Sequence, residues 1–238
     1  RLEGGLGNDW LMGGEGNDTL VGGNGSDTLD GGDWNDFYDL RETTRSKDLA
    51  IVKGNGSIEW SDSISGFDVS SATGDTNDVL GLGTTVVVAD TISDVTGQSV
   101  GKIAKHSISK GIITFKDASG KSLQINSNNR SDVQSYLQKN MVESGQTVAF
   151  AYDSDLSGSV DSIYVYQHNT NGDVTFVLLS GLVNATLGNT PGMGVIELKD
   201  VFGPRISDVT LDTNAMNLKF SEDVETVDFT GVVFKKLS

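Results

Sequence analysis

Apolar side chains near the N-terminus are sparse and evenly spaced. Leu11, Leu20, Leu29 and Tyr38 stand nine residues apart, and each follows two positions after an aspartate. Read from Gly4, the chain runs GGLGNDWLM, GGEGNDTLV, GGNGSDTLD, GGDWNDFYD. Because glycine permits the positive φ angles of tight turns, the pattern predicts short strand stubs separated by turns. Successive half-turns then stack the apolar side chains into a thin interior, and repeats two apart lie on the same edge.

This stacking is expected to pair the aspartates, Asp9 with Asp27 and Asp18 with Asp36. Stacked carboxylates and inward-turned carbonyls form an all-oxygen cage, which suits a hard cation with about six to eight ligands. Calcium fits this cage better than magnesium, which demands tighter octahedral geometry. Residues 1–39 hold nine acidic side chains and one basic side chain. Calcium binding is therefore expected to supply the folding energy of the segment, whereas a flexible Gly/Asp-rich linker would need no such register.

The nonapeptides resemble the RTX (repeats-in-toxin) family, whose repeat has the form G-G-x-G-x-D-x-U-x. The resemblance covers Gly4 to Asp39 and implies a parallel β-roll that binds several calcium ions. It also implies that glycine carbonyls join the aspartate carboxylates around each ion. The candidate metal ligands are Gly4, Gly5, Gly7, Asn8 and Asp9; Gly13, Gly14, Gly16, Asn17 and Asp18; Gly22, Gly23, Gly25 and Asp27; and Gly31, Gly32 and Asp36.

The fourth nonapeptide departs from the pattern, because Trp34 replaces its third glycine and Asp33 adds a carboxylate. Two interpretations follow: a further calcium site at Asp36, or the end of the roll. The segment 64–80 resembles the element that closes the roll after many RTX arrays. Residues 1–3 resemble the tail of an earlier nonapeptide, so the sequence is expected to begin inside a longer array.

The rest of the chain alternates Val-, Ile- and Thr-rich runs with Gly, Asp and Asn turns, which predicts strands. Strands are expected at 86–88, where the strand should be buried, and at 112–115, 122–125, 147–152, 162–166, 175–179, 206–211 and 216–221. Hairpin turns are expected at 117–120 and 169–173. One helix is expected at 131–140, capped by Ser131, with Val133, Tyr136, Leu137 and Met141 on one face.

The predicted fold class is all-β, in three parts. Residues 1–47 form the RTX β-roll, and residues 48–202 form a β-rich domain with one short helix that follows and caps the roll. Residues 203–238 resemble the opening strands of an Ig-like sandwich, since so short a segment cannot complete one.

A second acidic loop lies between two expected strands. From Asp153 through Asp155 to Asp161, side-chain oxygens occupy positions 1, 3, 5, 7 and 9 of an EF-hand loop, with Gly158 at position 6. The twelfth position is Tyr164 rather than glutamate, and the flanks are strands rather than helices. A polar hairpin turn and a calcium-stabilised β-turn are both open interpretations of this loop.

The charge excludes several partners. The formal net charge is −16 and the pI about 4.3, which argues against direct binding of nucleic acid or an anionic membrane. No apolar run is long enough to insert into a bilayer, and there is no cysteine. These features fit a secreted, extracellular protein, and the RTX resemblance implies export by type I secretion.

Catalytic motifs are missing from the sequence. Its two histidines, His106 and His168, belong to no H-E-x-x-H, and neither a G-x-S-x-G elbow nor a P-loop occurs. No enzyme activity is expected. Trp10, Trp34 and Trp60 suggest either a sugar-stacking platform or packing in a core or cap, and packing is favoured.

The sequence therefore predicts a calcium-binding structural module of a secreted bacterial RTX surface protein, either an adhesin or an S-layer component. Its partners would be calcium, neighbouring modules of the same long chain, or a host or cell-surface ligand. Two alternatives stay open: the export and folding region of a secreted RTX enzyme or toxin, and a module that binds a glycan or peptide in a calcium-dependent way.

Overall fold

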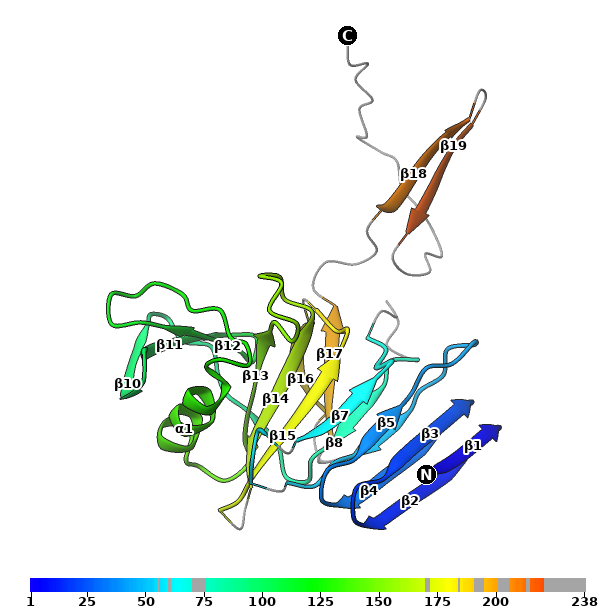
Figure 1. Ribbon diagram of the computed structural model, residues 1–238, viewed down its shortest axis with the longest axis horizontal. Helices are drawn as coiled ribbons and strands as arrows, with labels where there is room; N and C mark the ends of the chain where they lie inside the picture. The colour runs from blue at the N-terminus through cyan, green and yellow to red at the C-terminus, as the bar shows by residue number, and fades with distance from the viewer. Residues whose placement is uncertain are drawn as a thin grey trace. The chain divides into compact units, whose positions relative to one another are not determined.

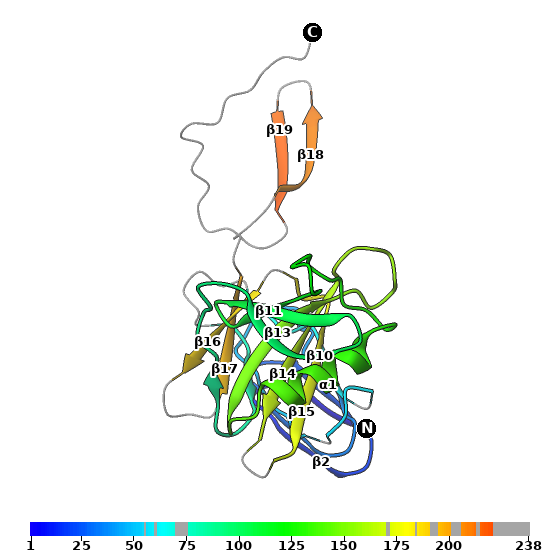
Figure 2. The same ribbon diagram turned by 90° about the vertical axis from the view of Figure 1, so that its left-hand side faces the viewer.

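The computed structural model describes residues 1–54, 56–59, 61–69, 76–169, 172–183, 185–190, 195–200, 206–212 and 215–220. They fall into two compact units, residues 1–201 and 202–238. The described part of the first unit is built of strands with one short helix, which confirms the all-β class (Figures 1 and 2). Among the described residues, no helix is long and apolar enough to cross a membrane.

Eight short strands alternate between two sheets at the N-terminal end of the first unit. One sheet contains β1 (Leu2–Leu6), β3 (Thr19–Asn24), β5 (Phe37–Asp39) and β7 (Asp62–Ser65), and the other contains β2 (Trp10–Glu15), β4 (Thr28–Asp33), β6 (Leu49–Ile51) and β8 (Val79–Gly81). Every neighbouring pair among these strands is parallel. The half-turns therefore stack as a parallel β-roll, as the nonapeptide spacing predicts.

One apolar side chain from each strand fills the interior of the roll. Leu20 pairs in register with Tyr38, and Tyr38 with Ile64, while Leu11 pairs with Leu29, Leu29 with Ala50, and Ala50 with Leu80. All seven are buried, and the most accessible, Leu11, is 9% exposed. The predicted column of four apolar side chains is confirmed, and three more continue it.

The parallel pairing continues beyond the fourth nonapeptide. Strand β4 pairs with β6, and β5 pairs with β7. The interpretation that the fourth copy ends the roll is therefore wrong, because strands without the glycine motif add further half-turns. In the segment 64–80, Phe67, Val69 and Leu80 pack in the interior of the roll, and residues 70–75 lie outside the described part.

Tyr38 is the one large polar side chain in this apolar column. Its hydroxyl donates a hydrogen bond to the carbonyl oxygen of Ile51 (2.7 Å) and accepts one from the amide of Gly31 (3.0 Å). These bonds cross from β5 to the opposite sheet. Ala50, beside Ile51, contributes the smallest side chain of the column.

Both sheets extend past the roll. Strand β7 pairs in parallel with β15 (Val174–Ser180), and the sheet continues through β14 (Ser162–His168), β13 (Gln146–Tyr152), β12 (Ile112–Lys116), β11 (Ile103–Ser109) and β10 (Val95–Val100), with β9 (Val86–Val87) beside β13. Strand β8 pairs with β17 (Val195–Asp200), which is followed by β16 (Ala185–Thr190). The two sheets of the roll thus continue without interruption into the strands beyond it (Figure 1).

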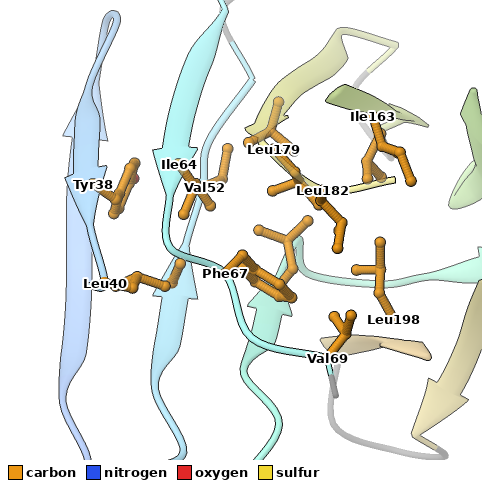
Figure 3. Close-up of a cluster of buried hydrophobic side chains, with 14 of the residues drawn as sticks. Tyr38, Leu40, Val52, Ile64, Phe67, Val69, Ile163, Leu179, Leu182 and Leu198 are labelled. Atoms are coloured by element: carbon orange, nitrogen blue, oxygen red, sulfur yellow. The ribbon is translucent and has the colours of Figure 1, made fainter. Parts of the chain in front are cut away.

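Strands β14 and β15 separate two hydrophobic cores. On the face toward the roll, Ile163, Val165 and Leu179 join Tyr38 and Ile64 in the first core (Figure 3). The second core gathers the alternate side chains: it consists mainly of Ile103, Phe115, Val133, Tyr136, Leu137, Val148, Phe150, Tyr164, Tyr166 and Phe176.

The helix α1 (Arg130–Asn140) covers the second core. Its buried residues are Val133, Tyr136 and Leu137, as the sequence predicts. Ser131 lies inside the helix rather than at its N-cap, which is Asn129 and makes no side-chain capping bond. The capping prediction is therefore wrong by two residues.

Two strand predictions need correction. Residues 122–125 do not form a full partner strand for β12; a single bridge joins Lys116 to Ser122, and β12 pairs with β11 instead. Val86 is half exposed rather than buried. The expected strands around the 169–173 turn are confirmed as β14 and β15, which pair antiparallel. In the second unit, β18 (Ile206–Asp212) and β19 (Ala215–Phe220) form an antiparallel hairpin.

Candidate metal centre

Glycine-rich turns join the strands of the roll. The second and fourth residues of the nonapeptides have φ between 96° and 115°: Gly5, Gly7, Gly14, Gly16, Gly23, Gly25 and Gly32. Residues other than glycine rarely adopt this conformation. Stacking adds a second constraint, because a Cβ on Gly23 would overlap the carbonyl oxygen of Gly5, and one on Gly32 would overlap that of Gly14. Gly23 and Gly32 are therefore needed for the stacking of the turns as well as for their backbone conformation.

The fourth turn keeps the same backbone without its glycine. Trp34 has φ 87°, a left-handed conformation that is unfavourable for a residue with a Cβ. Its side chain is 65% exposed, and that of Trp10 is 72% exposed. The prediction of core or cap packing is therefore wrong for these two tryptophans, and Trp60 lies outside the described residues.

The aspartates that end the turns form two hydrogen-bonded ladders. The amide of Asp9 donates to Oδ1 of Asp27 (2.8 Å), and the amide of Asp18 donates to Oδ1 of Asp36 (2.9 Å). The predicted pairing of repeats two apart is confirmed. The carboxylates of Asp27 and Asp36 thus each use one oxygen to hold the turn stacked next to them.

The second oxygen of these carboxylates is available to a ligand. Within the described residues, Oδ2 of Asp9, Asp27 and Asp36 is buried and has no hydrogen-bond partner. In each case it faces the first glycine of its own repeat: a Cβ on Gly4 would lie 2.8 Å from Oδ2 of Asp9, and one on Gly22 would lie 2.6 Å from Oδ2 of Asp27. A buried anionic oxygen without a partner is unfavourable unless a proton or a cation satisfies it.

The pKa values of the ladder carboxyls reflect this environment. Burial raises the pKa of Asp27 above its usual value, and the Asp9 and Glu42 carboxylates raise it further. Burial also raises the pKa of Asp36, with added contributions from Asp18 and other carboxylates. In both residues a backbone hydrogen bond opposes the rise. Both the desolvation and the mutual repulsion would be offset by a divalent cation.

Asn8 and Asn17 tie stacked turns together. The side-chain oxygen of Asn8 accepts a hydrogen bond from the amide of Ser26 (3.0 Å), and that of Asn17 accepts one from the amide of Asn35 (3.2 Å). These bonds join turns two repeats apart on the exposed side. A ligand role for the two asparagines stays a prediction.

The second predicted loop brings its three aspartates together. Carboxylate oxygens of Asp153, Asp155 and Asp161 lie within 4.8 Å of one another in the connection from β13 to β14. Asp153 accepts hydrogen bonds from the amides of Ser157 (3.1 Å) and Gly158 (3.0 Å), so both its oxygens have partners inside the loop. This arrangement is that of a polar hairpin turn, and metal binding there stays a prediction.

Three aspartates outside the nonapeptides occupy the same structural position. Asp48 and Asp78 immediately precede β6 and β8, and Asp62 begins β7. Sequence reasoning missed them because no glycine turn marks their half-turns. The signal that could have found them is the unit Asp-x-apolar, with the apolar position filled by Ala50, Ile64 and Leu80.

The stacked turns and the orphaned carboxylate oxygens define a calcium-binding parallel β-roll. Residues 3–38 match the family model of the RTX calcium-binding nonapeptide repeat in four copies. This segment is an RTX repeat array, and such repeats bind several calcium ions. The repeat is a structural calcium-binding element rather than a catalytic one, and proteins that carry it are typically secreted. No curated protein matches the chain.

Proposed function

We propose that the chain is a structural module of a secreted bacterial surface protein, an adhesin or S-layer component, that folds on calcium binding after type I secretion. The observation that carries the proposal is the pair of aspartate ladders. Each ladder holds buried carboxylate oxygens, such as Oδ2 of Asp27 and Asp36, without a partner among the described residues. Because these oxygens are unfavourable without a cation, the arrangement supports a chain that folds when it meets calcium.

The physical argument concerns the balance of burial and charge. Each half-turn of the roll buries about one apolar side chain, which does not by itself offset the conformational entropy lost when its nine residues are ordered. Without a cation, carboxylate repulsion adds to that cost. Calcium supplies the missing free energy when it replaces water with carboxylate and carbonyl oxygens.

The residues that would hold the ions follow from the turns. The RTX resemblance assigns ligand carbonyls to the glycines at the first, second and fourth positions of the repeats, and carboxylates to Asp9, Asp18, Asp27 and Asp36. Cytosolic calcium is too dilute to occupy sites tuned to extracellular concentrations, in the range of about 10⁻⁴–10⁻³ M. The acidic array would stay unfolded and fit for export, then fold outside the cell.

A calcium titration with matched variants tests this proposal. Circular dichroism and calorimetry are measured on the chain, on Asp27→Asn, and on Asp33→Asn, which removes the same charge from an exposed position in the same segment. We expect a cooperative gain of β-signal that requires more calcium in Asp27→Asn and is nearly unchanged in Asp33→Asn. Equal β-content in calcium and in EDTA would contradict the proposal.

The main alternative is that the chain is the export and folding region of a secreted RTX enzyme or toxin. It predicts the same calcium titration, so a different observation must separate the two. A catalytic or pore-forming domain encoded in the same polypeptide would favour the alternative. Further surface modules after the β18–β19 hairpin would favour the adhesin or S-layer role.

A second candidate function is calcium-dependent binding of a glycan or peptide. An open cavity of about 530 Å³ lies where the roll meets the strands beyond it, and its lining includes Asp33, Lys53, Gln167, Asn169 and Thr175. The lining combines these polar side chains with Ile51, Val52 and Leu82, a mixture that suits a ligand with both hydroxyl groups and apolar faces. Lys53→Ala and Asn169→Ala are expected to abolish any calcium-dependent signal on a glycan and peptide array, and an array without such a signal for the unmodified chain would exclude this function.

A further inference from the structure

The aspartate ladders extend beyond the matched repeats. The amide of Asp27 donates to Oδ1 of Asp48 (2.8 Å), and the amide of Asp36 donates to Oδ1 of Asp62 (2.7 Å). These bonds repeat the geometry that joins Asp9 to Asp27 within the array. The chain separations are 21 and 26 residues instead of 18. Longer connections therefore place Asp48 and Asp62 at positions in the ladders equivalent to those of the array aspartates.

The backbone confirms that the rungs are equivalent. The amide of Leu49 donates to the carbonyl oxygen of Asp27, and the amide of Ser63 donates to that of Asp36, both at 2.9 Å. In the array, the amide of Thr28 makes the same bond to Asp9 at 2.8 Å. Asp48 and Asp62 are thus placed as ladder aspartates by the sheet itself.

Each of these two carboxylates has an orphaned oxygen. Asp48 and Asp62 are both 1% exposed, and Oδ2 of each has no hydrogen-bond partner among the described residues. Burial, together with neighbouring carboxylates and against one backbone hydrogen bond, raises the pKa of both carboxyls to about 7. Protonation would add a buried O–H donor that needs an acceptor of its own, whereas a cation satisfies the oxygen directly.

Asp78 ends its ladder in a different way. Its Oδ1 accepts the amide of Asp48 (2.9 Å), and its Oδ2 accepts the amide of Asp68 (2.7 Å). Both oxygens therefore have partners, although Asp78 is as buried as the other two. The contrast shows that a ladder aspartate can be satisfied by backbone alone, and that Asp48 and Asp62 are not.

A further carboxylate stands beside Asp48. Glu42 accepts hydrogen bonds from the amide and the hydroxyl of Ser46, and it is among the charges that raise the pKa of both Asp27 and Asp48. The loop 41–47 therefore presents a carboxylate where the array presents a glycine-rich turn. The orphaned oxygens of Asp27 and Asp48 are ligands of the type that calcium prefers, and Glu42, whose two oxygens are held by Ser46, adds negative charge near them.

We propose that Asp48 and Asp62 are ligands of two additional calcium ions, one held with Asp27 near the charge of Glu42 and the other with Asp36. The metal columns on both edges of the roll then extend past the nonapeptides, and one of them stops at Asp78. This inference rests on the proposed calcium-dependent folding of the array.

The position of these ions gives them a role that the array ions lack. Asp62 lies on β7 in register with Val177 of β15, the strand through which the roll joins the rest of the sheet. Asp48 precedes β6, which pairs with β8. The two ions would therefore order the strands that connect the metal-dependent array to the remaining domain.

The test counts bound ions in matched variants. Native mass spectrometry at a fixed calcium concentration is combined with circular dichroism of the same samples, for the unmodified chain, Asp48→Asn, Asp62→Asn and the control Asp78→Asn. Asparagine keeps the Oδ1 acceptor and removes the charge. We expect Asp48→Asn and Asp62→Asn each to bind about one ion fewer, and Asp78→Asn to keep the full number despite lower stability.

The outcomes separate this inference from the proposed function. An unmodified chain that folds in EDTA and binds no calcium would overturn the proposed function itself. Calcium-dependent folding with an unchanged ion count in Asp48→Asn and Asp62→Asn would overturn only the additional sites.

If a variant fails to fold, Glu42→Gln decides for the Asp48 site: weaker binding of one ion in a folded chain supports it, and an unchanged isotherm refutes it. For the Asp62 site, Asp62→Glu keeps the charge but lengthens the side chain: weaker binding of one ion in a folded chain supports it, and an unchanged isotherm refutes it.

Discussion

The roll and the second core share one sheet, which runs from β1 to β10, but differ in what their interiors contain. Strands β1–β8 enclose one apolar side chain each and line their turns with buried carboxylates. The core beneath α1 instead packs aromatic rings against one another, with centroid distances of 4.8–5.9 Å among six ring pairs. Apolar burial stabilises the second core without a metal ion, while the roll is stable only when its carboxylates are neutralised. A single sheet can thus combine strands that depend on calcium with strands that do not.

Removal of calcium should separate the two regions most strongly. In EDTA we expect amide protection against hydrogen exchange to collapse in β1–β6, because the orphaned carboxylates repel one another. Protection should persist in α1, β13 and β14, which the aromatic core holds. Hydrogen-exchange mass spectrometry with and without calcium measures both. Uniform loss across the chain would show that the second core also needs the metal, and magnesium serves as the control that should restore little protection.

Acid should partly replace calcium in the metal-free chain. The pKa values of Asp48 and Asp62 rise from 3.8 to about 7 in the folded roll, so the folded state binds more protons than the unfolded state between these values. The resulting stability is fully present below pH 3.8 and is lost as the pH rises through 7. In calcium-free buffer, β-signal is expected to be larger at pH 5 than at pH 7.5. The Asp48→Asn/Asp62→Asn double variant should show a flatter pH dependence, and an identical profile in the variant would speak against this assignment.

Two glycines at equivalent positions separate turn conformation from turn stacking. Gly5 and Gly23 have φ 103° and 107°, but a Cβ on Gly5 meets open space whereas one on Gly23 overlaps the Gly5 carbonyl oxygen. Gly5→Ala is expected to cost about 1–2 kcal/mol through backbone strain. Gly23→Ala should cost a further 1–3 kcal/mol or so, because the neighbouring turn must move. Urea unfolding at saturating calcium measures both, and equal losses would mean that the turns are not stacked this closely.

The smallest expected effect is a gain at the fourth turn. Trp34→Gly removes a left-handed strain of about 1–2 kcal/mol and adds roughly 0.5–1 kcal/mol of unfolded-state entropy to be overcome. The exposed indole loses little burial, so we expect a net stabilisation below about 1 kcal/mol and a slightly lower calcium midpoint. A higher midpoint would show that the indole contributes packing that outweighs the strain.

The sequence predicts the roll well because one physical constraint recurs at every ninth residue. Glycine positions determine the turns, and the spacing of Leu11, Leu20 and Leu29 determines which side chains meet. Strand alternation also explains why the packing prediction failed for Trp10: a residue next to the inward Leu11 must point outward. Local pattern was sufficient wherever the turn geometry came from glycine itself.

Prediction failed where the structure depends on distant partners. Asp48, Asp62 and Asp78 reach their rungs through connections of irregular length, so no period reveals them. The turn at 117–120 forms, with the amide of Gly120 bonded to Asp117, but β12 finds its main partner in β11 on the other side. Asp-x-apolar triplets are common in any acidic chain, so the sequence alone does not show which of them contribute an aspartate to a ladder.

Tyr38 has a consequence for how the array finds a unique alignment. A stack of near-identical repeats can slip by a whole turn with little change in its contacts, since one leucine replaces another. The phenol hydroxyl of Tyr38, bonded to Ile51 and Gly31, distinguishes its level of the column from those of the leucines. A slip of one turn would leave the hydroxyl without these partners. This single aromatic residue therefore favours one register among those that the near-identical repeats would otherwise allow.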